Sequence, residues 1–384
     1  MMQKLLTIIC LLCCTAGLNC QITTTHTIQH DGLEREYKIY VPDVYDGNTA
    51  VPLVFNLHGY TSSMTEQEVY GDFRSIADTA NFILVHPNGI LDGNGDRYWN
   101  AFSNMSEPDD IGFLTQLIEV MSAEYNINSD CVYSAGMSNG GFMSFELACE
   151  ASDLFTAVAS VTGSMEIFRP VSCNPTETVP AMQIHGTADA VVPYNGSAAY
   201  TSVENVIQHW VDENDANTTP TIIQVPDNDP NDGSTAEQHI YENGDGLSVV
   251  EHFKVINGGH TWPGSTINLP GAGSTNQDFD ASVEIWRFFR QHCVSAPSSV
   301  KSVDSLQDNI RLYPNPAHDR LVMEHSIFEG NSSVVIFDAF GRAIHREQVT
   351  SNTHTMDISH FASGVYLVCV ESDREVITKK IVKR

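Results

Sequence analysis

Strand-like apolar segments and helical segments take turns along residues 21–293. The chain opens with alternating apolar and polar positions that break at Asp31-Gly32, which predicts a β-hairpin of strands 24–29 and 35–41. The later strands are largely apolar, as strands buried on both faces are, and are predicted at 51–57, 82–86, 131–135, 157–161, 180–185 and 249–256. The segments between them predict helices at 66–81, 109–125, 142–150, 202–214 and 282–292.

This alternation predicts an α/β fold for residues 21–293, with a mostly parallel sheet covered by helices on both faces. The opening hairpin would form an antiparallel edge, which is the α/β-hydrolase architecture. Residues 294–309 change to Ser, Pro, Val, Gln and Asp and are predicted to be a linker. Short alternating runs separated by turns then predict a small all-β sandwich over residues 310–384.

The first twenty residues have the pattern of a secretory signal peptide. Lys4 carries a positive charge, residues 5–14 are apolar but too few to span a bilayer, and small residues follow. We expect the mature chain to begin near Leu18 or Gln21, and we predict no transmembrane helix. Cys20 leaves a lipoprotein signal open, although the bulky Asn19 before it argues against one.

The charge and the cysteines narrow the choice of partners and compartment. The 384 residues include 48 acidic and 19 basic ones, and a net charge of -29 argues against a nucleic-acid partner. An exported protein can form disulfides. Beyond the leader, the predicted pairs are Cys149–Cys173 and Cys131–Cys293, which leaves Cys369 as a small buried core residue.

The stretch Gly136-Met137-Ser138-Asn139-Gly140-Gly141 lies between an apolar strand and a helix. A serine in such a glycine-flanked turn is typical of a nucleophile elbow, where side chains at the flanking positions would collide. The serine hydroxyl would be exposed at a helix N-terminus, where the backbone dipole favours negative charge. Turns of small residues between a strand and a helix are also common in proteins without a catalytic serine. Whether Ser138 is a nucleophile therefore depends on the residues found in the rest of the chain.

An acid and a base follow Ser138 in the order that this fold requires, Ser, then Asp, then His. Asp189 comes directly after strand 180–185, and His260 follows strand 249–256, so both lie at carboxyl ends of strands. We predict that Ser138 attacks an ester carbonyl, that His260 moves the proton, and that Asp189 orients His260. The oxyanion would be held by the backbone amides of Asn139 and Tyr60.

Other histidines and aromatic residues near these motifs have simpler explanations. We expect His58 to hold the oxyanion loop by hydrogen bonding, His185 to brace its own loop, and His86 to be structural. Trp99 and Trp262 could be core residues, but we expect both to contact substrate, and Trp262 lies two residues from His260. No metal site is predicted.

Five motifs in order resemble the polyhydroxybutyrate depolymerase-like esterases, which are related to feruloyl and acetyl xylan esterases. They are Leu57-His58-Gly59, His86-Pro87-Asn88-Gly89, Gly136 to Gly141, His185-Gly186-Thr187-Ala188-Asp189 and Gly258-Gly259-His260-Thr261-Trp262-Pro263-Gly264. The resemblance implies a secreted carboxylic ester hydrolase without a metal or an organic cofactor. Its substrate would be a polyester or a plant polysaccharide ester, and Tyr60, where depolymerases often have cysteine, leaves aromatic-acid and acetyl esters open.

The tail has a resemblance of its own. Leu312-Tyr313-Pro314-Asn315-Pro316, Asp338-Ala339-Phe340-Gly341-Arg342, Gly364-Val365-Tyr366 and the basic end resemble the C-terminal sorting domain of Bacteroidetes type IX secretion. That implies the type IX secretion machinery as a partner, passage across the outer membrane, removal of the tail, and release or surface attachment. A carbohydrate-binding sandwich is the alternative, but most of the tail's aromatic residues look like core.

Two other functions remain open from the sequence. A serine peptidase of the prolyl-oligopeptidase type shares the fold and the order of the triad, although only a hairpin stands where such enzymes usually carry a propeller. A non-catalytic secreted binding module is the third possibility. Specificity would lie in the loops around Tyr60, Trp99 and Trp262, and the sequence does not identify the acyl group or the alcohol.

Overall fold

The computed structural model describes residues 22–102, 108–244, 246–293, 310–325, 332–337, 343–349, 353–371 and 376–384. The chain divides into two compact units, Met1–Ala296 and Pro297–Arg384. The predicted signal peptide and the predicted linker lie outside the described residues. Within the described part of the chain, no helix combines the length and the apolar character needed to cross a membrane.

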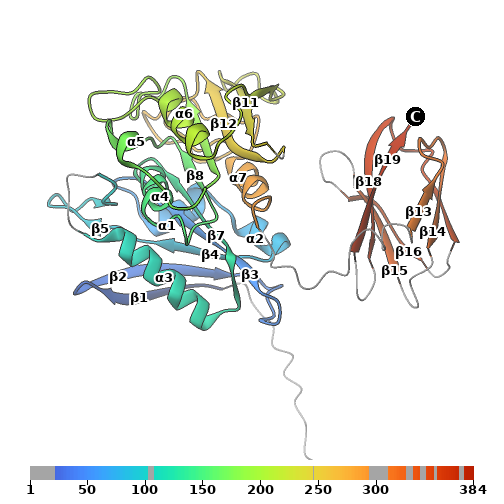
Figure 1. Cartoon of the computed structure of the whole chain (residues 1–384), viewed down its shortest axis with the longest axis horizontal. Coiled ribbons are helices and arrows are strands. Elements are labelled where there is room, and N and C mark those ends of the chain that lie inside the picture. The colour runs from blue at the N-terminus through green and yellow to red at the C-terminus, as the bar shows by residue number, and fades with distance from the viewer. Residues whose placement is uncertain are drawn as a thin grey trace, which may run out of the picture. The chain divides into compact units, whose positions relative to one another are not determined.

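The first unit is built on a ten-stranded sheet with the order β1-β2-β4-β3-β7-β8-β9-β12-β11-β10 (Figure 1). The six strands from β4 to β12 in this order run parallel to one another, and the strands beyond them at both edges are antiparallel. The strands are β1 (Ile22–His30), β2 (Leu33–Val41), β3 (Val51–Leu57), β4 (Ile83–Pro87), β7 (Ile127–Met137), β8 (Ala157–Val161), β9 (Ala181–Gly186), β10 (Thr221–Gln224), β11 (Thr235–Glu242) and β12 (Ser248–Ile256). This arrangement confirms the predicted fold class and the hairpin edge.

The second antiparallel edge, β10 and β11, has little sequence signal. Every residue of β10 is exposed, including Ile222 and Ile223, so no alternation of buried and exposed positions marks it as a strand. Its pairing with β11 forms it, which is a contact between segments distant in sequence.

Each face of the sheet carries its own hydrophobic core, because successive side chains of a strand point to opposite faces. Leu53 and Phe55 of β3 pack into one core with residues from α3 (Asp110–Glu124), α4 (Asn139–Glu150) and α6 (Val203–Glu213). Val54 packs into the other core with residues from α1 (Met64–Tyr70), α2 (Arg74–Ala80) and α7 (Ala281–Phe289). The strands are apolar throughout because helices cover both of their faces.

The single helix predicted at 66–81 is wrong, because the structure has two helices, α1 and α2, with a break at Gly71. The carbonyl of Gly71 accepts a hydrogen bond from Asn56 Nδ2 at 2.8 Å. A Cβ at Gly71 would lie 2.9 Å from the ring of Trp262. Tertiary contacts therefore end α1, and local helix propensity could not reveal them.

Both predicted disulfides are present. Cys131–Cys293 joins β7 to the residues after α7, and Cys149–Cys173 joins the end of α4 to the short helix α5 (Arg169–Ser172). Cys369 belongs to neither disulfide, and it is half-buried rather than fully buried as expected.

The second unit consists of a three-stranded and a four-stranded antiparallel sheet, β13-β14-β17 and β16-β15-β18-β19. Leu321 of the first sheet and Ile336 of the second share one core, which confirms the predicted all-β sandwich. Phe361 and Tyr366 are in that core, as expected of the tail's aromatics, whereas Tyr313 is exposed. The strands are β13 (Ile310–Tyr313), β14 (Arg320–His325), β15 (Ser332–Phe337), β16 (Ala343–Val349), β17 (Thr353–Asp357), β18 (Gly364–Glu371) and β19 (Val376–Lys383).

Candidate active site

Ser138 stands between the last residue of β7 and the first residue of α4, with φ 53° and ψ -118°. L-residues rarely adopt this conformation, and it persists only where the surroundings impose it. A Cβ at Gly136 would lie 2.3 Å from the backbone of Gly140, and one at Gly140 would lie 2.4 Å from Leu57 O. The glycines therefore permit the tight turn that strains the Ser138 backbone, as the sequence predicted.

Asp189 lies in the loop after β9, and its carboxylate is fully enclosed by hydrogen-bond donors. The backbone amides of Val191 and Val192 both donate to Oδ1 at 2.8 Å. His260 Nδ1 lies 2.7 Å from Oδ2. Burial by itself would raise the pKa of Asp189, but the hydrogen bonds from His185 and His260 outweigh it and hold the pKa well below its usual range. Asp189 is therefore a carboxylate, and His260 Nδ1 is the donor that faces it.

His260 lies in the loop after β12, which the chain brings back against the end of β9. With Nδ1 donating to Asp189, the neutral ring has its acceptor at Nε2. His260 and Ser138 line the same cavity, so the turn after β7 and the loop after β12 bring both residues to it. The backbone amide of His260 donates to Ala272 O, which ties this loop to residues 269–272.

His185 is fully buried beside Asp189 and supports its loop. Its Nε2 lies 2.9 Å from Val192 O and 3.3 Å from Asp189 Oδ2, while Nδ1 lies 2.8 Å from Gln183 Nε2. These contacts confirm the expectation that His185 braces the loop.

The loop after β3 approaches the elbow closely, because a Cβ at Gly59 would lie 3.4 Å from Ser138 Cβ. Buried His58 holds this loop, as predicted, with Nδ1 2.7 Å from Gly59 O and Nε2 accepting from Gly89 N at 2.9 Å. Burial lowers the pKa of His58 to about 4, so the ring is neutral. Among the described residues, the backbone amides of Tyr60 and Asn139 have no hydrogen-bond partner.

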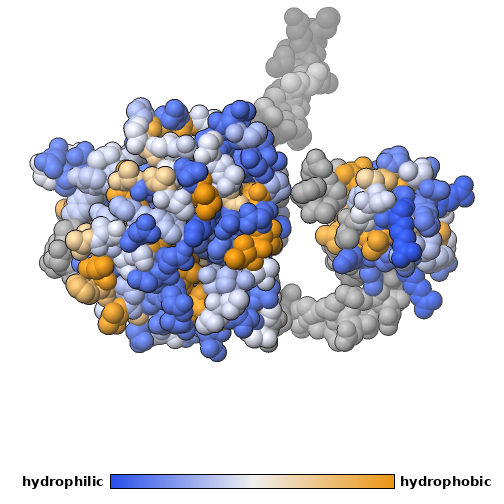
Figure 2. Space-filling model, turned by 90° about the horizontal axis from the view of Figure 1, so that it is seen from above, coloured by the Kyte–Doolittle hydropathy of each residue, from blue (hydrophilic) through white to orange (hydrophobic). Residues whose placement is uncertain are grey.

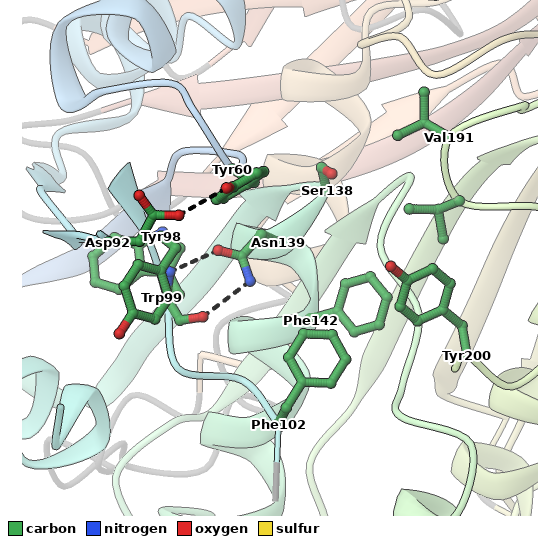
Figure 3. Close-up of a pocket in the computed structure, with 11 residues that line it drawn as sticks. Tyr60, Asp92, Tyr98, Trp99, Phe102, Ser138, Asn139, Phe142, Val191 and Tyr200 are labelled. Atoms are coloured by element: carbon green, nitrogen blue, oxygen red, sulfur yellow. Dashed lines mark hydrogen bonds between the residues drawn. The ribbon is translucent and has the colours of Figure 1, made fainter. Parts of the chain in front are cut away.

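One cavity beside Ser138 is lined mainly by aromatic rings, and we call it the aromatic cavity (Figure 3). Its volume is about 450 Å³. The side chain of Asn139 bonds both to Trp99 N, at 2.6 Å, and to Trp99 O, at 3.0 Å, so it fastens the segment that bears Trp99 to the elbow. The lining residues are Tyr60, Asp92, Tyr98, Trp99, Phe102, Ser138, Asn139, Phe142, Val191, Val192 and Tyr200.

A second cavity, of about 600 Å³, is also lined by Ser138, and we call it the aliphatic groove. Several of its hydrophobic side chains are exposed, among them Val69, Ile267 and Leu269. The face of the molecule in Figure 2 is mostly hydrophilic, with hydrophobic residues in small groups. The lining residues of the groove are Gly59, Tyr60, Thr61, Ser62, Glu66, Gln67, Val69, Tyr70, Met137, Ser138, Val191, His260, Ile267, Leu269, Pro270, Gly271 and Ala272.

The two tryptophans expected to contact substrate have different positions. Trp99 lies on the wall of the aromatic cavity, and its indole Nε1 donates to His58 O at 2.9 Å. Trp262 is 1% exposed and lines neither cavity, which corrects the expected pocket position. Its ring packs against Phe73, and its Nε1 donates to Ser282 Oγ. Trp262 therefore supports the loop of His260 from within the core.

Several lining residues were not predicted from the sequence. Phe142 is one turn beyond Ser138 on α4, so helical spacing could have found it. Phe102, Tyr200, Ile267 and Leu269 belong to loops without a readable pattern, and only the sheet topology brings these loops to one edge.

Two groups in the described part of the chain have metal-ligand atoms close together, and neither lines the cavities. Cys149, Cys173 and His209 form the first, but its two sulfurs are joined in a disulfide. His30, Asp31 and Asp109 form the second, which is mostly exposed acidic surface.

Comparison with known proteins identifies a family for each of the two parts of the chain. Residues 30–246 match the family model described as "Putative esterase". The chain belongs to this esterase family. Residues 311–384 match the model described as a secretion system C-terminal sorting domain, so the esterase carries a sorting domain at its C-terminus.

Three curated relatives are similar to this esterase. "Putative esterase NocK" of Nocardia uniformis subsp. tsuyamanensis is 28% identical over 64% of this chain and 75% of its own length. Feruloyl esterase B of Piromyces equi is 26% identical over 59% of this chain and 42% of its own. Poly(3-hydroxyalkanoate) depolymerase C of Paucimonas lemoignei is 25% identical over 61% of this chain and 59% of its own. The chain thus spans less than two thirds of the latter two proteins.

Among solved structures, an acetyl xylan esterase from Aspergillus awamori is similar with a TM-score of 0.51 at 13% identity. The match covers 70% of this chain and 99% of that one. At this identity the likeness shows the fold alone.

Proposed function

We propose that the esterase is a serine carboxylic ester hydrolase in which Ser138, His260 and Asp189 form the catalytic triad. Ser138 Oγ attacks the ester carbonyl carbon while its proton passes to His260 Nε2. When the tetrahedral intermediate collapses, His260 returns this proton to the departing alcohol oxygen. Water then attacks the acyl-enzyme by the same route and releases the acid and Ser138.

The observation that carries this proposal is the bond of 2.7 Å from His260 Nδ1 to the buried carboxylate of Asp189. This bond leaves His260 Nε2 as the acceptor, and the ionised carboxylate stabilises the imidazolium that forms. The strained backbone of Ser138 and its place in the same groove as His260 give further support.

The amides of Tyr60 and Asn139 fit the role of an oxyanion hole. A developing oxyanion needs donors that are already oriented and not engaged elsewhere. Both amides have no partner among the described residues, and both residues line the aromatic cavity with Ser138. The amide of Asn139 also belongs to the N-terminus of α4, where the helix dipole favours negative charge.

The substrates we propose are polyesters or esters of plant polysaccharides. The names of the relatives, a feruloyl esterase and a poly(3-hydroxyalkanoate) depolymerase, support this range. The sorting domain supports export, with the type IX secretion machinery as the partner, the outer membrane as the barrier crossed, and removal of the tail afterwards.

Replacing Ser138 by alanine tests the catalytic proposal. We expect S138A to lose hydrolysis of a short chromogenic ester and covalent labelling by a serine-directed phosphonate. Ser164→Ala is the matched control, because Ser164 is buried with its Oγ bonded to Thr201 O and lines neither cavity. Turnover by S138A at the wild-type rate would refute the assignment.

A further inference from the structure

Two cavities of different chemistry meet at the nucleophile. Tyr60, Ser138 and Val191 line both the aromatic cavity and the aliphatic groove. The side chain of Tyr60 is 47% exposed, and its hydroxyl donates to Asp92 Oδ2 at 2.9 Å, which holds the ring in place between them. An ester bound at Ser138 can therefore place its two halves in separate spaces.

The positions of the proposed catalytic groups indicate which cavity takes the acyl group and which takes the alcohol. His260 lines the aliphatic groove and not the aromatic cavity, whereas Asn139 lines the aromatic cavity and not the groove. The base has to reach the alcohol oxygen in order to protonate it as it leaves. The alcohol oxygen therefore lies on the side of the groove, and the acyl group extends past Asn139 into the aromatic cavity.

The aromatic cavity suits a flat, unsaturated acyl group. Phe142 stands between Phe102 and Tyr200, with ring centroids 5.5 and 5.2 Å away, which are distances typical of interacting aromatic pairs. In Figure 3 these three rings lie together on the side of Ser138 away from the Tyr60–Asp92 bond. The bonds between Asn139 and Trp99 fix the opposite wall. An acetyl group has one methyl beyond its carbonyl and would leave most of this volume to water.

The aliphatic groove differs from the aromatic cavity because aliphatic side chains form its rim. Val69, Ile267 and Leu269 are 50%, 37% and 38% exposed around the space in front of His260. These side chains bury apolar surface best against a hydrocarbon portion of the alcohol.

We propose, resting on the triad proposed above, that the esterase binds its ester across Tyr60, with an aromatic acyl group in the aromatic cavity and the alcohol in the aliphatic groove. The preferred substrates are esters of aryl or arylpropenoyl acids whose alcohol carries a hydrocarbon portion next to the ester oxygen.

The test is a matrix of methyl and butyl esters of acetic acid and cinnamic acid, assayed as kcat/KM with the full-length enzyme. The wild type should prefer the cinnamoyl over the acetyl group. In Phe102→Ala this acyl preference should fall by about tenfold, because the lost ring contact removes a large apolar area from the bound acyl group. Leu269→Ala is the counterpart in the groove, where the preference for butyl over methyl alcohols should fall and the acyl preference should stay unchanged.

The outcomes separate this proposal from the catalytic one. If neither acetate nor cinnamate esters are hydrolysed and the phosphonate fails to label the protein, the triad proposal falls. If acetate esters are hydrolysed without a preference for cinnamoyl, or if Leu269→Ala rather than Phe102→Ala lowers the acyl preference, the orientation is wrong while the triad stands. Should Phe102→Ala fail to fold, Tyr200→Ala removes another ring of the same cavity and is judged by the same ratio.

Discussion

Replacing Asp189 by asparagine keeps the shape of the side chain and removes its charge. The amides of Val191 and Val192 both donate to Oδ1, so the asparagine has to keep its oxygen there. Its Nδ2 then points at His260, in place of the oxygen that accepts from Nδ1 at 2.7 Å. His260 Nδ1 has to become an acceptor, and the proton moves to Nε2, where it prevents the ring from taking the proton of Ser138.

The expected loss in kcat follows from this change of tautomer. The variant also lacks the negative charge that stabilises the imidazolium, and in a serine triad this pair of effects amounts to about 10⁴-fold. That factor corresponds to about 5 kcal/mol of transition-state stabilisation. The Michaelis constant should change little, because Asp189 lines neither cavity.

The assay is steady-state hydrolysis of a chromogenic ester, with circular dichroism to confirm that the variant is folded. Groups that act as a unit are not additive, so Asp189→Asn in a His260→Ala background should cause almost no further loss. Asp280→Asn is the control, because Asp280 caps α7 through its backbone contacts and asparagine can do the same. A fall of less than about tenfold in kcat for folded Asp189→Asn would refute the reasoning.

Two further predictions concern stability. His86 is fully buried and neither ring nitrogen has a hydrogen-bond partner among the described residues; burial lowers its pKa from 6.5 to about 4. As the pH falls, His86 therefore binds a proton at a higher pH in the unfolded chain than in the folded one. The free energy of unfolding should fall by about 3 kcal/mol between about pH 6.5 and about pH 4 for this reason. Urea unfolding at several pH values should show this fall in the free energy of unfolding for the wild type and a smaller fall for His86→Leu. An equal dependence on pH in both proteins would contradict the prediction. Asp110 accepts from Arg35 at 2.6 Å with both side chains buried, so Asp110→Asn should lower the free energy of unfolding by about 3–5 kcal/mol, since the charge of Arg35 loses its partner. The neighbouring Asp109→Asn, which keeps an exposed helix cap, should change it by less than about 1 kcal/mol, and similar losses in both variants would argue against the buried pair.

Local sequence patterns predicted the structure correctly where it depends on short stretches of the chain. The glycines around Ser138 predicted the elbow, because the close approach of Gly136 to Gly140 involves residues near each other in sequence. The apolar strands predicted a sheet covered on both faces. By contrast, the helix predicted at 66–81 is interrupted at Gly71, which contacts Asn56 outside the helix and Trp262 far away in sequence.

The two tryptophans show the same limit within the site. Trp262 lies two residues from His260 and Trp99 lies in a loop rich in aromatic residues, and the sequence predicted substrate contact for both. The fold directs Trp99 to the wall of a cavity and Trp262 into the core under α1 and α7. Sequence proximity to a catalytic residue gives the position of a backbone, but packing decides the direction of a side chain.

By itself, the sequence determined the fold class and the order of Ser138, Asp189 and His260 along the chain. These properties depend on periodicity, on residue type and on turns, which are local. Only the tertiary structure decided that Asp189 meets His260 within 2.7 Å, that Tyr60 separates two cavities, and that rings from three segments form one aromatic wall. The physical reason is that parallel strands bring their following loops to one edge of the sheet, so residues distant in sequence become neighbours.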